Sequence, residues 1–208
     1  MKLYEFAPTR SIRARWTLQE LDIPFESITV RLPDGEHKDP KYLAVNPAGK
    51  LPTLVDGDFV LTESAAIVKY LAEKYPERRL WPTSVRERAE ADRWMLFTVT
   101  ELEQPLWRIA RHSFIYPEAQ RLAADIDIAK HEFKEMARVL ERHLRDREFV
   151  VGNHVTVTDF VLAYTLDWAN EEALLDDAPI LVRYMERMYA RPKAPLRISK
   201  ALASVGLA

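Results

Sequence analysis

Cysteine is absent from the 208 residues of this chain, which excludes several kinds of chemistry at once. Without a thiol the chain can form no disulfide, no thiolate metal site and no covalent cysteine intermediate. Any sulfur chemistry must therefore use the thiol of a ligand.

Glycine is also scarce, with five residues in the chain. The motifs GxGxxG, GxxxxGK[ST] and GxSxG are all missing, which excludes the common nucleotide-binding and α/β-hydrolase sites. His131 is followed by Glu132 and Glu135, but the second histidine of a zinc-binding helix is missing. We therefore expect no metal site.

Long apolar runs and an excess of one charge are lacking as well. No stretch reaches the roughly 18 apolar residues of a membrane span, and the N-terminus has no signal-peptide pattern. Thirty basic and thirty-two acidic residues give a formal net charge of -2, which does not favour nucleic acid or a membrane surface as a partner. The sequence thus predicts a cytoplasmic protein.

The first 76 residues predict an α/β domain. Apolar residues recur at helical spacing in 11–21, and Asp56-Gly57 marks a hairpin between two strands. The order β-α-β followed by β-β-α is that of a thioredoxin-like domain, with parallel strands in the first unit. The expected strands are 2–6, 25–30, 51–55 and 59–61, and the expected helices are 11–21 and 64–75.

The remainder of the chain predicts helices alone. A proline-rich and charged linker at 77–85 separates the first domain, 1–76, from an all-α domain, 86–208. Thr156 and Asp159 form a capping box, which gives Asp159 a structural role. Asp125 and Asp127 are interpreted as solvated surface. The expected helices are 86–109, 117–145, 158–172, 179–189 and 195–203.

The stretch 46–54 combines with 61–67 to predict a binding site for an anionic, peptide-like ligand. A cis bond before Pro52 would leave the backbone of Leu51 facing outward, where it could pair with a ligand amide. Ser64 begins a helix, whose first N–H groups attract a carboxylate. The alternative is that Pro52 only starts a strand and that Thr62 or Ser64 only caps a helix.

Three motifs together resemble the cytosolic glutathione transferase superfamily over essentially the whole chain. They are N-P-x-G-K-L-P at 46–52, E-S-x-A-I at 63–67 and T-x-x-D at 156–159. The resemblance implies a thioredoxin-like domain followed by a helical domain, with glutathione as co-substrate.

The resemblance also implies a set of glutathione contacts. The residue before the cis-proline would pair with the cysteinyl backbone, and the Glu-Ser pair would bind the γ-glutamyl end. A lysine and a histidine would approach the glycyl carboxylate. The residues so implied are His37, Lys50, Leu51, Pro52, Glu63 and Ser64.

The group that activates the thiol is expected in or near the loop 7–11. A thiol of reference pKa about 8.5 needs a stabilising donor at neutral pH, and the resemblance places that donor between the first strand and first helix, or on that strand. Ser11 is the first candidate, followed by Thr9 and Tyr4, with Arg10 as an electrostatic helper. The alternative for Ser11 is simple helix capping.

The resemblance implies a transferase whose glutathione thiolate attacks an electrophilic small molecule or a peroxide, in a homodimer. The alternative is a catalytically silent protein-interaction module, which the superfamily also contains. The second substrate would contact the helix around residue 110, although such side chains at helical spacing more often form core and solvated surface. The residues in that stretch are Trp107, Arg108, Arg111, His112, Phe114 and Tyr116.

Overall fold

The computed structural model describes residues 1–206. Its backbone contacts divide the chain into two compact units, each described separately below. The first unit comprises Met1–Trp81 and the segment from Tyr189 onward, and the second comprises Pro82–Met188. The sequence-based boundaries 1–76, 77–85 and 86–208 stay a prediction.

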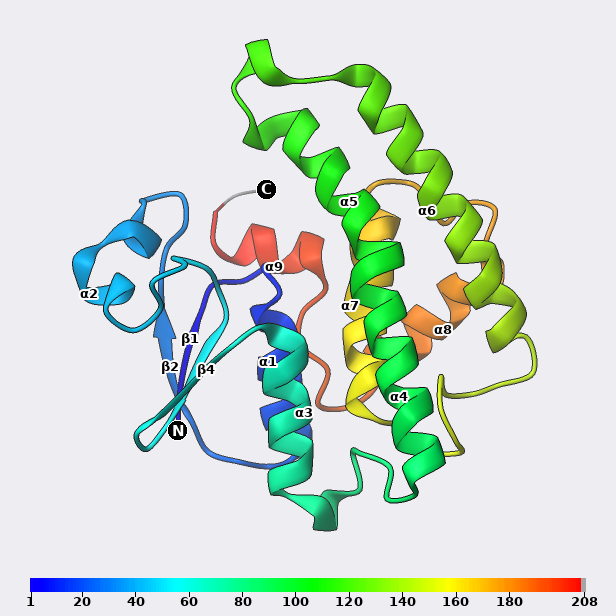
Figure 1. Ribbon diagram of the computed structural model, residues 1–208, viewed down its shortest axis with the longest axis horizontal. Coiled ribbons are helices and arrows are strands. Elements are labelled where there is room, and N and C mark those ends of the chain that lie inside the picture. The colour runs from blue at the N-terminus through cyan, green and yellow to red at the C-terminus, as the bar shows by residue number, and fades with distance from the viewer. Residues whose placement is uncertain (207–208) are drawn as a thin grey trace. The chain divides into compact units, whose positions relative to one another are not determined.

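The first unit contains a four-stranded sheet in the order β2-β1-β3-β4 (Figure 1). β1 and β2 are parallel, as the strand-helix-strand pattern predicted, whereas β3 is antiparallel to both β1 and β4. This is the predicted thioredoxin-like order. The strands are β1 Lys2–Glu5, β2 Glu26–Thr29, β3 Thr53–Asp56 and β4 Phe59–Thr62.

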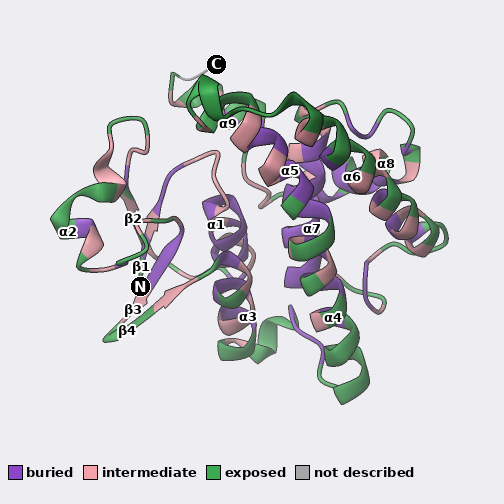
Figure 2. Ribbon diagram, turned by 45° about the horizontal axis from the view of Figure 1, so that its top comes forward, coloured by how far each residue is buried: buried purple, intermediate pink, exposed green. Residues whose placement is uncertain are grey.

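Two helices, α1 (Ser11–Glu20) and α3 (Ser64–Lys74), lie side by side on one face of the sheet (Figures 1 and 2). Leu3 and Leu54 are fully buried and form the sheet side of this core. The short α2 (Pro40–Leu43) lies by the other face. This helix was not predicted from the sequence, because a single helical turn is too short to show periodicity.

The C-terminal segment belongs to the first unit and is held to α1 by charged side chains. Arg191 donates two hydrogen bonds to Glu20, at 2.7 and 2.9 Å, and the ring of Tyr189 lies 4.9 Å from that of Trp16. The last helix, α9, runs over Ile198–Ser204 and begins three residues later than predicted from Pro195.

The second unit is helical throughout its regular structure, as predicted. The single helix expected over 86–109 is wrong in detail, since a π-helical segment, Thr98–Leu102, interrupts the run, and a second one follows it. Pro105 lacks an N–H and cannot complete the α-helical ladder, which accounts for the wider turn of the first π-helix, just before it. The segments are α4 Val85–Phe97, the π-helices Thr98–Leu102 and Arg111–Ile115, α5 Glu103–Ala110, α6 Ala123–Leu144, α7 Val157–Glu171 and α8 Pro179–Tyr189.

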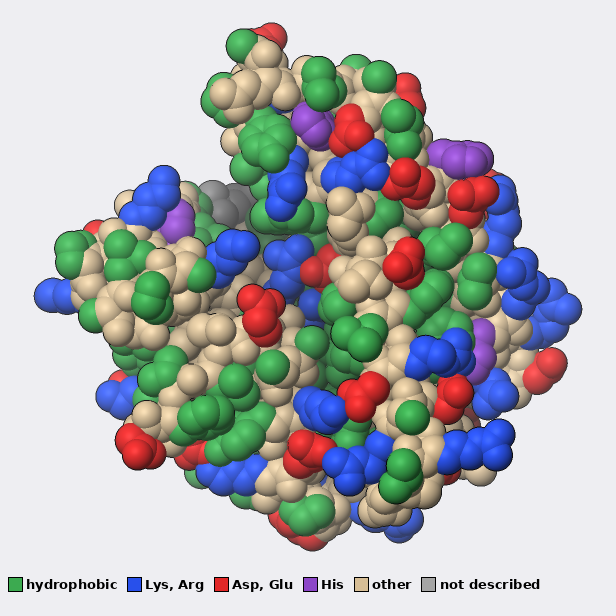
Figure 3. Space-filling view, in the orientation of Figure 1, with side chains coloured by type: hydrophobic (Ala, Val, Ile, Leu, Met, Phe, Trp, Pro, Cys, Tyr) green, Lys and Arg blue, Asp and Glu red, His purple; other side chains and the backbone are tan. Residues whose placement is uncertain are grey.

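The start of α6 also differs from the prediction, which placed it at Pro117. A separate 3-10 turn occupies Glu118–Gln120, and the extended backbone of Leu122 comes before the helix. Among residues 1–206 no helix is long and apolar enough to cross a membrane. Acidic and basic side chains are interspersed on the face shown in Figure 3, which agrees with the small net charge.

The capping box at the start of α7 is confirmed. Asp159 is fully buried and accepts hydrogen bonds from the backbone and hydroxyl of Thr156, at 2.7 and 2.9 Å. It also accepts from the Val150 N–H at 2.9 Å and the Tyr184 hydroxyl at 2.6 Å. Burial raises the pKa of Asp159, and these donors oppose that rise. Asp159 therefore joins α7, α8 and the preceding loop.

Candidate active site

The strand register brings four connecting segments to one end of the sheet. Thr53 lies opposite both Tyr4 and Thr62 in antiparallel pairs, and β2 runs parallel to β1. The end of β1, the end of β2, the start of β3 and the end of β4 therefore lie together. The sequence-predicted site residues all lie in or beside the segments that leave or enter this end.

The loop before β3 is held by buried polar side chains. Asn46 donates to the Lys50 carbonyl at 2.8 Å and to the Thr53 hydroxyl at 3.0 Å. The Tyr42 hydroxyl donates to the same Lys50 carbonyl and accepts from Thr53. The Leu51–Pro52 peptide bond is cis, as predicted. These hydrogen bonds within the protein thus hold the loop in place up to Lys50.

Leu51 differs from its neighbours, because its backbone is not used by the protein. Within residues 1–206 neither its N–H nor its C=O has a hydrogen-bond partner. The residue is half-buried at the start of β3. Its backbone groups are therefore available to pair with the amide of an extended ligand.

The first turn of α3 also presents unused donors. Glu63 adopts φ 64° and ψ 113°, a conformation rare for a residue with a side chain. The first helical bond runs from the Ile67 N–H to the Glu63 carbonyl at 2.9 Å. The N–H groups of Ser64, Ala65 and Ala66 therefore have no partner in the described part of the chain, and a helix N-terminus of this kind attracts an anion.

The hydroxyls of Thr9 and Ser11 form one network in the loop between β1 and α1. Thr9 donates to the Phe6 carbonyl at 2.5 Å, and its oxygen lies 2.7 Å from that of Ser11. Because the hydrogen of Thr9 goes to Phe6, Ser11 is the donor in this contact. Ser11 is 1% exposed and accepts from the Phe6 N–H at 3.3 Å. Ser11 therefore lies deeper in the protein than Thr9, which is half-buried.

The other two candidates are Tyr4, on β1, and Arg10, between Thr9 and Ser11 in the sequence. Tyr4 is half-buried, and its ring centre is 5.7 Å from that of Tyr42. Its hydroxyl has no hydrogen bond within residues 1–206. Burial raises the pKa of Tyr42, and its bonds to Thr53 and Asn46 oppose that rise. Arg10 immediately precedes α1, whose first turn contains no acidic residue.

The two residues predicted for the glycyl end lie near the same loop. The side chain of Lys50 is exposed. His37 is half-buried, and its Nδ1 atom is buried without a hydrogen-bond partner in the described residues. Gly49, with φ 61°, packs against His37, since a Cβ there would lie 2.9 Å from the His37 carbonyl. Only glycine fits this contact.

Sequence comparison decides the family to which this constellation belongs. Residues 1–73 match the model of the glutathione S-transferase N-terminal domain, and residues 103–192 match that of the C-terminal domain. The chain belongs to the glutathione S-transferase family. It is 34% identical over 166 residues to glutathione S-transferase F10 of Arabidopsis thaliana, covering 76% of this chain and 77% of the relative. It is 32% identical over 179 residues to glutathione S-transferase GstB of Escherichia coli K12, covering 85% and 86%.

Solved structures agree with this assignment. A glutathione S-transferase from Xylella fastidiosa superposes with a TM-score of 0.84 at 28% identity, covering 100% of this chain and 99% of that one. The theta-class enzyme from Xanthomonas axonopodis pv. citri, determined with glutathione bound, gives a TM-score of 0.81 at 28% identity over 95% and 96%. The fold predicted from the sequence is therefore confirmed.

The structure adds to the candidate site three residues that were not predicted from the sequence. Tyr42 and Asn46 hold the loop of Lys50, and buried Arg13 donates to the Ser64 hydroxyl at 3.1 Å. Two of them had a sequence signal: Asn46 opens the N-P-x-G-K-L-P motif, and Arg13 is a charged residue on the apolar side of its helix. Tyr42 had none, since it belongs to the missed α2.

In the second unit, part of the stretch considered for a second substrate is occupied by ion pairs. Arg108 binds Asp125 through both carboxylate oxygens and also binds Glu132. His112 Nε2 lies 3.3 Å from Asp125. The hydrogen bond from Arg108 lowers the pKa of Asp125. The interpretation of Asp125 as solvated surface was wrong, because the carboxylate is half-buried and held in ion pairs. These pairs could not be predicted, since the partners lie 13 and 17 residues away in the sequence.

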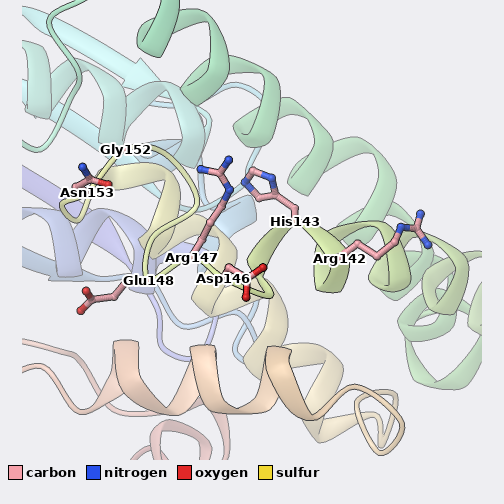
Figure 4. Close-up of a pocket in the computed structure, with 7 residues that line it drawn as sticks. All are labelled: Arg142, His143, Asp146, Arg147, Glu148, Gly152 and Asn153. Atoms are coloured by element: carbon pink, nitrogen blue, oxygen red, sulfur yellow. The ribbon is translucent and has the colours of Figure 1, made fainter.

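A cavity of about 810 Å³ lies in the second unit, between the end of α6 and the loop before α7 (Figure 4). Its lining carries two arginines and two carboxylates, so its formal charges balance and favour neither sign of ligand. None of the predicted site residues lies here. The lining residues are Arg142, His143, Asp146, Arg147, Glu148, Gly152 and Asn153.

We expect His143, in this cavity, to make the stability of the transferase depend on pH. Burial lowers the pKa of His143, and its hydrogen bond to the Val150 carbonyl opposes this only in part. The unfolded state therefore takes up the proton more readily, and the free energy of unfolding falls as pH drops below about 6.5. Urea denaturation at pH 7.5, 6.5 and 5.5 measures this loss.

The matched variants are His143→Gln and His154→Gln. His143→Gln should flatten the pH dependence of the free energy of unfolding between pH 7.5 and 5.5. His154→Gln, which removes an exposed side chain, should leave that dependence unchanged. An identical slope in the wild type and His143→Gln would show that His143 does not contribute.

Proposed function

We propose that this glutathione transferase binds glutathione as an extended tripeptide at the shared end of the sheet. The observation that carries the proposal is the unused Leu51 backbone beside the open N-terminus of α3. Leu51 pairs with the cysteinyl amide, and Ser64 with the first N–H groups of α3 binds the γ-glutamyl carboxylate. Glu63 binds the γ-glutamyl amine.

The glycyl carboxylate then extends toward the loop of Lys50 and His37. Lys50 is exposed and supplies a positive charge, and His37 supplies a ring nitrogen that the described residues leave without a partner. Pro52 fixes the start of β3 beneath the cysteinyl residue. Binding thus uses both ends of the tripeptide and its central backbone.

Thr9 is the donor that we assign to the thiolate, with Ser11 behind it. Thr9 is more exposed than Ser11. When the Thr9 hydroxyl turns from the Phe6 carbonyl to the sulfur, that carbonyl still accepts a hydrogen bond from the Thr9 N–H, at 2.9 Å. The Ser11 hydroxyl and N–H both point at the Thr9 oxygen and strengthen it as a donor. Arg10 adds positive charge, and Tyr4 is the competing donor.

The thiolate would attack an electrophilic carbon of a small molecule or a peroxide, and we propose that the enzyme works as a homodimer. A light-scattering mass close to that of one 24.2 kDa chain would contradict the dimer.

Glutathione binding can be tested directly. We expect retention on immobilised glutathione and conjugation of an activated aryl halide. Because hydrogen bonds to charged groups contribute about 1.5–3 kcal/mol, Ser64→Ala should weaken glutathione binding about 10–100-fold by calorimetry.

Ser84→Ala is the matched serine control. Ser84 caps α4 in the second unit and lies outside the proposed site, so its loss should leave glutathione affinity unchanged. A wild-type protein that fails to bind millimolar glutathione would contradict the proposed function and favour a silent interaction module.

A further inference from the structure

Arg13 is a fully buried cation directly behind the proposed γ-glutamyl subsite. It lies within α1, is 1% exposed and is among the largest fully buried side chains of the chain. An arginine stays charged in proteins, and burying its charge is costly without strong hydrogen bonds. A buried arginine is therefore not expected where apolar packing alone is needed.

Its guanidinium reaches the first residue of the neighbouring helix. Arg13 Nη1 lies 3.1 Å from the Oγ atom of Ser64, which is itself 5% exposed. Arginine can only donate hydrogen bonds, so Ser64 must accept here. The hydrogen of the Ser64 hydroxyl is consequently left to point elsewhere.

The direction left to that hydrogen decides what Ser64 can bind. Ser64 begins α3, whose first N–H groups are unpaired in the described residues. A hydroxyl that accepts from a cation becomes a stronger donor, since hydrogen bonds in a chain polarise one another. Arg13, Ser64 and the helix end then all favour the same negative charge.

We propose that Arg13 is a positioning residue for glutathione binding, which orients the Ser64 hydroxyl toward the α-carboxylate of the γ-glutamyl group. The inference rests on the proposed placement of glutathione. Because Arg13 acts through Ser64, its effect is confined to one group of the tripeptide, the γ-glutamyl α-carboxylate. Arg13 itself touches no substrate atom.

The test compares glutathione with 4-aminobutanoyl-cysteinyl-glycine, the same tripeptide without its γ-glutamyl α-carboxylate. Arg13→Gln should weaken the binding of glutathione about tenfold in calorimetry, as expected for the loss of a charge-assisted bond. The same variant should bind the shortened tripeptide as the wild type does. In kinetics, KM for glutathione should rise while kcat stays nearly constant.

A double-mutant cycle separates positioning from packing. In the Ser64→Ala background, Arg13→Gln should change glutathione affinity less than about twofold, because the hydroxyl that Arg13 orients is gone. Arg15→Gln is the matched control: Arg15 is on the same helix but binds Glu5 and Ser27, and it should leave affinity unchanged.

Arg13→Lys keeps the charge if the glutamine variant fails to fold. It should bind glutathione with intermediate affinity and the shortened tripeptide normally. Equal losses for both tripeptides, or additive effects with Ser64→Ala, would overturn the role of Arg13. Failure of the wild type to bind glutathione would instead refute the underlying placement.

Discussion

Thr9→Val should lower kcat of glutathione conjugation by about a hundredfold, the usual effect of removing one donor from a developing or stabilised anion. Valine keeps the shape of threonine but cannot donate to the sulfur. In the proposed placement Leu51 and Ser64 bind the tripeptide away from the sulfur, so the dissociation constant of glutathione should change little. The pKa of the bound thiol should rise, which ultraviolet titration of the thiolate measures.

The comparison with other hydroxyls makes this test specific. Ser11→Ala should give a smaller loss, because Ser11 contacts Thr9 and in our proposal acts on the sulfur only through it. Thr100→Val is the matched control: Thr100 is exposed in the second unit and donates to the Leu96 carbonyl. If Thr9→Val keeps full activity while Tyr4→Phe loses it, Tyr4 is the donor and our assignment is wrong.

Asp159→Ala should lower the free energy of unfolding by about 3–5 kcal/mol, the range for breaking a buried polar network. Four donors lose their acceptor at once: the Val150 N–H, the Tyr184 hydroxyl, and both the N–H and hydroxyl of Thr156. These groups are buried and cannot turn to water without opening the start of α7. Denaturant unfolding followed by circular dichroism measures the loss.

Two variants calibrate this effect. Thr156→Ala removes one member of the capping box and should cost about 1 kcal/mol. Asp127→Ala removes an exposed carboxylate from α6 and should change stability by no more than about 0.5 kcal/mol. If Asp159→Ala costs no more than Thr156→Ala, Asp159 is an ordinary cap and not the centre of a network.

Local features could be predicted because neighbouring residues determine them. The capping box depends on a hydroxyl and a carboxylate three residues apart, and the hairpin depends on the turn residues Asp56-Gly57. Pro105 was equally visible, but its consequence depended on the helix continuing on both sides. The π-helical segment just before it therefore appeared only in the structure.

The family could also be recognised from the sequence, because the motifs at 46–52 and 63–67 lie on two short segments. The same motifs predicted the binding loop. Their meeting at one end of the sheet follows from strand register, with Thr53 opposite Thr62. Register was not visible in the motifs, although the order of the strands was. The roles of Leu51 and Ser64 stay proposals that binding measurements test.

The sequence by itself determined the two-part fold, the absence of a protein thiol and the local caps, because each depends on composition or on residues a few positions apart. The tertiary structure decided which polar groups are already paired. It placed Ser11 behind Thr9, joined Arg108 to Asp125, and brought Arg13 to Ser64 across 51 positions of sequence. A hydrogen bond depends on distance and direction, and only the packed chain fixes both for residues so far apart.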